Sequence, residues 1–87
     1  MKKYTLNGRK MTSREEAYEH ISETLEFPEY AGKNLDALYD LLSVMSAEVE
    51  LKNACDMLKE LRGYGCKILK CFFDASEDNG NFKFTVK

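Results

Sequence analysis

Residues 34–51 have the sequence NLDALYDLLSVMSAEVEL, in which two hydrophobic periods follow one another. In Leu35–Met45, apolar residues recur at the three- and four-residue spacing of one helix face, and the asparagine before them is a favourable N-cap. In Glu48–Leu51, charged and apolar residues alternate, as in a strand with one buried face. A helix that leads directly into a strand is typical of an α/β fold.

The same two periods alternate through the rest of the 87 residues, which is enough chain for a single domain spanning residues 1–87. Upstream, we expect a strand at Lys2–Leu6, a turn at Asn7-Gly8 and a helix at Ser13–Leu25. Downstream, we expect a helix at Ala54–Leu61 that is broken by Gly63-Tyr64-Gly65. A further helix is expected around the apolar stripe of Ile68, Leu69, Phe72 and Phe73. A turn at Asp78–Gly80 and a strand at Phe82–Val86 complete the chain.

The expected order of elements is therefore β-α-α-β-α-α-β. Strands that are separated by helices are usually parallel, and the connections between them are right-handed crossovers. The sequence predicts a small α/β domain in which helices pack on a three-stranded parallel sheet.

The composition excludes several classes of protein. The chain is 44% apolar and 32% charged with a single proline, which is typical of a globular domain. Its net charge of −2 argues against a general nucleic-acid-binding protein, and no apolar stretch approaches the roughly 20 residues of a membrane helix. Cys55, Cys66 and Cys71 lack C-x-x-C spacing, so neither a disulfide framework nor a zinc site is expected. We expect buried, reduced thiols, no cofactor and a cytoplasmic location.

The charges are distributed unevenly along the chain. Glu15–Asp40 contains eight acidic residues and one lysine, so this segment carries −7 while the remainder of the chain carries +5. Two interpretations are open at this point. The glutamates can simply keep two helix faces soluble, or the segment can form an acidic surface that attracts a basic partner.

The helix expected after residue 34 has two contrasting sides. Its apolar side consists of Leu35, Leu38, Leu42 and Met45, which we assign to the core. Asp36, Tyr39, Asp40 and Ser43 fall on the opposite side, where the two carboxylates are like-charged i, i+4 neighbours that repel each other. An exposed ring beside two repelling carboxylates contributes little to stability. It suits a docking surface, because the ring supplies an anchor and the carboxylates pair with arginine or lysine.

Residues 27–40, FPEYAGKNLDALYD, closely resemble the signature of the barstar family, whose members are intracellular inhibitors of secreted ribonucleases. The resemblance extends over the whole chain in length and element order, and it implies the same three-stranded parallel sheet. It also implies that the second helix and the loop before it block the active site of a small, barnase-like ribonuclease. The inhibitor is then a monomer when free, and it contacts neither nucleic acid nor a membrane.

The resemblance assigns roles to individual residues. Tyr30 matches a loop tyrosine that packs on the enzyme, while Asp36 and Asp40 match aspartates that meet its cationic residues, with Asp40 at the centre. Asp74 aligns with a further family acid on the fourth helix, across a gap. Together with Ser43 on the same helix face, the expected partner-binding residues are Tyr30, Gly32, Asn34, Asp36, Tyr39, Asp40, Ser43 and Asp74.

Several residues depart from the family pattern, and they bear on which ribonuclease is bound. Ala31 replaces a tyrosine, Lys33 replaces an acid, and Tyr39 and Met45 stand where barstar has tryptophans. The alternative function is therefore a barstar-like interaction module whose partner is not a nuclease. We expect no enzymatic activity, because the sequence assigns neither a nucleophile nor an orienting group to His20. No metal site is expected either.

Overall fold

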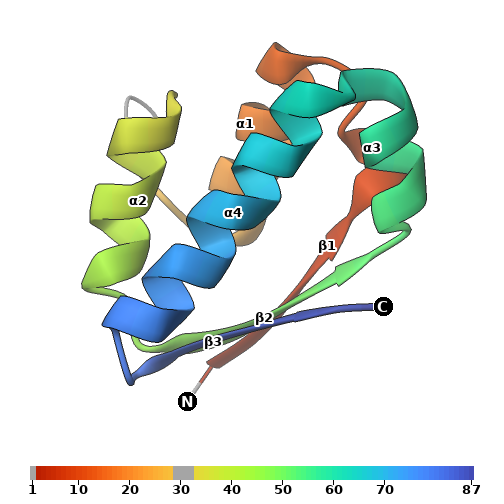
Figure 1. Ribbon diagram of the computed structural model, residues 1–87. Helices are drawn as coiled ribbons and strands as arrows, with labels where there is room; N and C mark the ends of the chain where they lie inside the picture. Colours follow the sequence, from red (N-terminus) through yellow and green to blue (C-terminus); the bar gives the residue numbers. More distant parts are fainter. Residues whose placement is uncertain (1, 29–32) are drawn as a thin grey trace.

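The computed structural model describes residues 2–28 and 33–87, and within them the predicted order of strands and helices is confirmed (Figure 1). A short 3₁₀ helix, η1, is an addition that the sequence analysis did not predict. The elements are β1 (Lys2–Asn7), η1 (Gly8–Lys10), α1 (Arg14–Thr24), α2 (Leu35–Ser43), β2 (Ala47–Lys52), α3 (Ala54–Leu61), α4 (Gly63–Asp78) and β3 (Phe82–Val86).

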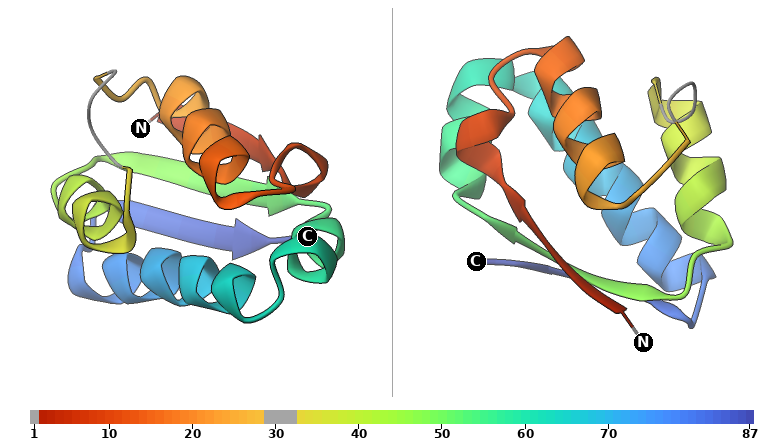
Figure 2. Two further views of the ribbon diagram at one scale, coloured as in Figure 1. Left: turned by 90° about the horizontal axis from the view of Figure 1, so that it is seen from above. Right: turned by 180° about the vertical axis from the view of Figure 1, so that it is seen from behind.

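The sheet has three parallel strands in the order β1-β2-β3, which confirms the predicted fold class. Val49 on the central strand is in register with Tyr4 on β1 and with Phe84 on β3. The helices gather on one side of the sheet, as the two views in Figure 2 show. The burial of β2 follows this arrangement, because its buried residues alternate with partly exposed glutamates.

The core lies between the sheet and the helices. Leu38, Leu42, Ile68 and Val49 are fully buried there. Phe72 on α4 stacks on Phe84 with ring centroids 4.6 Å apart, so α4 is fixed against the strand that follows it. Of the two apolar stripes predicted from helical spacing, Leu38, Leu42, Ile68 and Phe72 are buried in the core. Leu35, Met45 and Leu69 are only partly buried and pack against it, and Phe73 remains 43% exposed at the rim of the sheet.

The break between α3 and α4 lies one residue earlier than predicted. Gly63-Tyr64-Gly65 does not interrupt the helices but forms the first turn of α4. The chain instead changes direction at Arg62, whose φ of 52° and ψ of −124° lie in a region that favours glycine. Gly65 has a packing role, since an added Cβ would lie 3.1 Å from the Leu58 side chain of α3.

The predicted turn at Asn7-Gly8 is a tightly packed junction between the end of β1 and the end of β2. Gly8 is buried, and a Cβ at this position would lie 2.1 Å from the carbonyl oxygen of Asn53. The Asn53 side-chain amide donates to Asn7 Oδ1 at 2.9 Å, and the Asn7 backbone N–H donates to His20 Nε2 at 2.9 Å. Burial, together with the charge of Lys10, lowers the pKa of His20 below its usual value.

The expectation of three buried thiols is correct only for Cys71. Cys55 and Cys66 are exposed on α3 and α4, because helical spacing turns them away from the sheet, and all three cysteines are free. Burial and the nearby Asp74 and Asp36 raise the pKa of Cys71 to about 11. Within the described residues, no helix is long and apolar enough to cross a membrane.

Candidate partner-binding surface

Local sequence signals and buried contacts hold α2 in place. Asn34 Oδ1 accepts the backbone N–H of Ala37 at 2.8 Å, which is the N-cap predicted from the sequence. At the other end, the Asn79 side-chain amide, just beyond α4, donates to the carbonyl oxygens of Leu42 at 3.1 Å and Met45 at 2.8 Å. Side-chain hydrogen bonds to backbone groups therefore hold α2 at its start and at its end.

That outer face carries Asp36 and Asp40, both of which are exposed. No described residue forms an ion pair with either carboxylate. Ser43 lies on the same stretch of helix, half-buried, and its hydroxyl donates to the carbonyl oxygen of Asp40 at 2.8 Å. Within the described part of the chain, the repulsion between these like-charged i, i+4 neighbours is therefore not relieved by an ion pair.

Tyr39 differs from the exposed ring that the sequence analysis predicted. The ring is half-buried and packs against the core, and its hydroxyl donates to the carboxylate of Asp78 at the end of α4. This hydrogen bond, with partial burial, raises the pKa of Tyr39. Tyr39 lies at the edge of the apolar face that Leu38 and Leu42 form. From this position its large side chain can pack toward α4 instead of pointing into solvent.

Asp74 on α4 lies beside α2. It shares a shallow depression of about 260 Å³ between α2 and α4, which we call the α2–α4 groove. The groove is lined by Leu35, Asp36, Tyr39, Lys67, Lys70, Cys71 and Asp74. The Lys70 ammonium forms an ion pair with the carboxylate of Asp74 at 2.9 Å, and the Cys71 thiol donates to the carbonyl oxygen of Leu35 at 3.6 Å.

The structure thus brings together part of the predicted set of residues. Asp36, Tyr39 and Asp74 meet in the α2–α4 groove, and Asp40 and Ser43 lie farther along the same helix. Tyr30 and Gly32 lie outside the described residues. The sequence analysis did not link Asp78 to Tyr39, because that contact depends on how α4 packs beside α2 and no local pattern records it.

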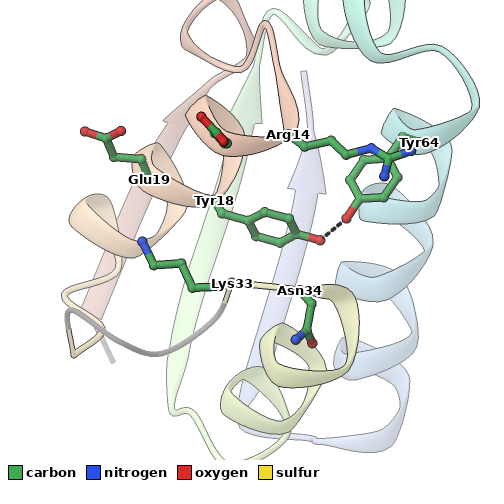
Figure 3. Close-up of a pocket in the computed structure, with 7 residues that line it drawn as sticks. Arg14, Tyr18, Glu19, Lys33, Asn34 and Tyr64 are labelled. Carbon is green, nitrogen blue, oxygen red and sulfur yellow. Dashed lines mark hydrogen bonds between the residues drawn. The ribbon is translucent and has the colours of Figure 1, made fainter.

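A second, larger cavity of about 620 Å³ lies on the α1 side of Asn34 (Figure 3). The hydroxyls of Tyr18 and Tyr64 are hydrogen-bonded to each other across it, and the Arg14 guanidinium lies 4.1 Å from the centre of the Tyr64 ring. Burial, with the hydroxyl of Tyr64, raises the pKa of Tyr18. The charged lining residues are Arg14, Lys33, Glu15 and Glu19, so the charges balance and favour no ligand of a single sign.

The described residues offer no arrangement suited to metal chemistry. Among residues 2–28 and 33–87, no group of three or more histidine, cysteine, aspartate or glutamate side chains is placed to hold a metal ion. The α2–α4 groove instead combines two carboxylates and two ammonium groups with one tyrosine, one leucine and one cysteine.

These features define a small α/β fold in which helices cover one side of a parallel sheet and α2 exposes two carboxylates. Comparison with known families gives the more specific assignment. The whole chain, residues 1–87, matches the family described as "Barstar (barnase inhibitor)", and the protein belongs to that family. It is also 30% identical over 91 residues to YrdF of Bacillus subtilis (strain 168), a candidate ribonuclease inhibitor by name, with all of both chains covered.

Proposed function

We propose that the protein inhibits a small, basic ribonuclease by covering its active site with α2 and the loop before it. The observation that carries the proposal is the pair of exposed carboxylates, Asp36 and Asp40, on a helix whose opposite side is fully buried at Leu38 and Leu42. Membership of the barstar family and the name of the Bacillus subtilis relative support the same function.

The chemistry of the target explains why such a surface inhibits. A ribonuclease must hold the phosphates of RNA, so its active site carries lysine or arginine side chains. Carboxylates that stand where phosphates bind satisfy the same cations, and the body of the inhibitor excludes the substrate. A rigid, preorganised helix loses little conformational entropy on docking, which favours tight binding.

The finer assignments belong to this proposal. Asp40 occupies the central position, and the contact surface comprises Tyr30, Gly32, Asn34, Asp36, Tyr39, Asp40, Ser43 and Asp74. The protein acts as one domain and one monomer in the cytoplasm, where it protects the producing cell from a ribonuclease that is destined for secretion. It contacts no nucleic acid directly and performs no catalysis.

A barstar-like module for a partner that is not a nuclease is the alternative. It is favoured by Tyr39, because this residue stands where the family has a larger ring and its hydroxyl is already bonded to Asp78. Such a module would retain the acidic α2 face without inhibiting RNA cleavage, so a direct assay separates the two functions.

The test is a titration of the protein into a fixed amount of ribonuclease, with RNA cleavage as the readout at two RNA concentrations. The enzymes are barnase and the small ribonucleases secreted by the organism that encodes this chain. At the lower RNA concentration we expect cleavage to stop at one equivalent of the protein. At the higher concentration more of the protein should be needed, because inhibitor and RNA compete for the same site. Undiminished cleavage with every one of these enzymes would contradict the proposal.

A further inference from the structure

The α2–α4 groove carries both signs of charge, although the helix beside it is acidic. Asp36 on α2 and Asp74 on α4 supply carboxylates, and Lys67 and Lys70 on α4 supply ammonium groups. The helices α2 and α4 lie side by side and run in the same direction, so the start of each lies at the same end of the groove (Figure 1). A partner that docks on α2 therefore meets the lysines of α4 as well.

The two lysines are not equivalent. Lys70 forms an ion pair with Asp74 at 2.9 Å, so its charge is compensated within the groove. Lys67 lines the same groove, is exposed, and forms no ion pair with any described residue. Its charge is not needed to neutralise Asp74, because Lys70 already does so.

An uncompensated lysine on this surface opposes the proposed function unless the partner satisfies it. A ribonuclease is basic around its RNA site, and like charges placed together at an interface are unfavourable. A carboxylate on the ribonuclease removes the repulsion and adds an attraction. Charge complementarity of this kind determines which partner is accepted more than it determines the overall affinity.

We infer that Lys67 is a specificity-determining contact, which pairs with an aspartate or glutamate of the ribonuclease beside the cations that pair with Asp36 and Asp40. The inference rests on the proposed function. It identifies the partner as a ribonuclease with a mixed-charge rim, in which a carboxylate adjoins the basic RNA site. A uniformly basic ribonuclease is then a poor partner for this protein.

The test is the charge reversal Lys67→Glu, compared with Lys59→Glu as a matched control. Lys59 is exposed on α3, which lies on the far side of α4 from α2 (Figure 1). Both variants add the same negative charge to the inhibitor. General attraction to a basic enzyme predicts that both bind at least as tightly as the wild type, whereas a specific Lys67 contact predicts that only Lys67→Glu binds more weakly.

Binding is measured by titration calorimetry with the ribonuclease that the wild type inhibits, and thermal melting confirms that both variants fold. We expect Lys67→Glu to raise the dissociation constant about tenfold and Lys59→Glu to leave it within about twofold of the wild type. In addition, reversing single carboxylates of the ribonuclease to lysine should yield one enzyme variant that again binds Lys67→Glu as tightly as the two wild-type proteins bind each other.

Three outcomes are distinct. Selective weakening by Lys67→Glu, with rescue by one enzyme variant, supports the inference. Equal or tighter binding by Lys67→Glu overturns it and leaves the proposed function intact, since the wild type still inhibits. Absence of inhibition by the wild type itself contradicts the proposed function, and the inference fails with it.

Discussion

Asp36 on α2 and Asp74 on α4 line the same groove although they are 38 positions apart in the sequence. The negative charges of both carboxylates help to raise the pKa of the buried thiol of Cys71. The relationship arises because α2 and α4 pack as neighbours on one side of the sheet. It places a second carboxylate beside the acidic face of α2, and Lys70 forms an ion pair with that carboxylate.

Salt should control how fast the protein meets a basic ribonuclease. The segment Glu15–Asp40 carries −7, and the reach of its attraction shrinks from a Debye length of about 30 Å at 0.01 M salt to about 8 Å at 0.15 M. We expect the association rate in stopped-flow experiments to fall steeply over this range, with a smaller change in the dissociation rate. Neutralising Glu19 and Glu23, which are exposed on α1, should lower the association rate modestly. An association rate that does not vary with salt would exclude electrostatic steering.

Gly8→Ala should destabilise the fold by about 3 kcal/mol. The new Cβ would lie 2.1 Å from the Asn53 carbonyl oxygen, so either the end of β1 or the start of α3 must shift. Gly63→Ala is the matched control, because a Cβ there has no described neighbour within 4 Å and the residue begins a helix. Urea unfolding should show a large loss for the first variant and none for the second. Equal stabilities would mean that the close backbone approach at Gly8 is absent in solution.

Arg62→Gly should stabilise the protein by about 1 kcal/mol, because it removes a side chain from a backbone conformation that favours glycine. Glu26 also has a positive φ, 61°, but its carboxylate accepts hydrogen bonds from Lys2 and Tyr4, both at 3.1 Å. Glu26→Gly should therefore gain less than Arg62→Gly in the same urea titration. A loss of stability in Arg62→Gly would show that contacts of the arginine side chain stabilise the fold by more than the backbone strain at this residue destabilises it.

His20 should make stability depend on pH in a window just below its usual pKa of about 6.5. Burial and Lys10 lower the pKa of the folded state, and the neutral ring accepts the N–H of Asn7. The unfolded chain therefore takes up a proton at a higher pH than the folded protein does. Stability falls as the pH drops from 6.5 toward the folded pKa, below which His20 causes no further loss.

Urea midpoints between pH 5 and 7.5 measure this dependence, and His20→Gln is the control. Glutamine also offers an acceptor to the Asn7 N–H but does not titrate, so its midpoint should vary less with pH in this window. A wild type and a variant with the same pH profile would remove His20 as the cause.

Patterns within single elements accounted for most of the fold. Alternation located β2 and β3, the leucine spacing located the buried side of α2, and Asn34 was correctly identified as its N-cap. The errors arose where tertiary contacts decide the structure. A break in the helix was expected at Gly63-Tyr64-Gly65, but the chain turns at Arg62, which has a positive φ. Gly65 lies inside α4, where it allows close packing on Leu58 of α3.

The candidate surface shows the same division. The outward direction of Asp36 and Asp40 followed from helical spacing alone and is confirmed by their exposure. The bond from Tyr39 to Asp78 and the position of Lys67 in the groove depend on a neighbouring helix that begins more than 20 residues later in the chain. No periodicity within α2 or α4 reports which helix lies beside which.

Asp40→Ala provides the most direct test that the α2 face binds the ribonuclease. Asp40 is exposed and unpaired within the described residues, so the variant should keep the melting temperature of the wild type. In titration calorimetry its binding should weaken by about 2–5 kcal/mol. This is the general range for truncating one member of a desolvated charge pair, and measurements on the complex of barnase with barstar contribute to it. Glu60→Ala on α3, an exposed acid far from α2, should bind as the wild type does. An Asp40→Ala variant that binds as tightly as the wild type would contradict the account.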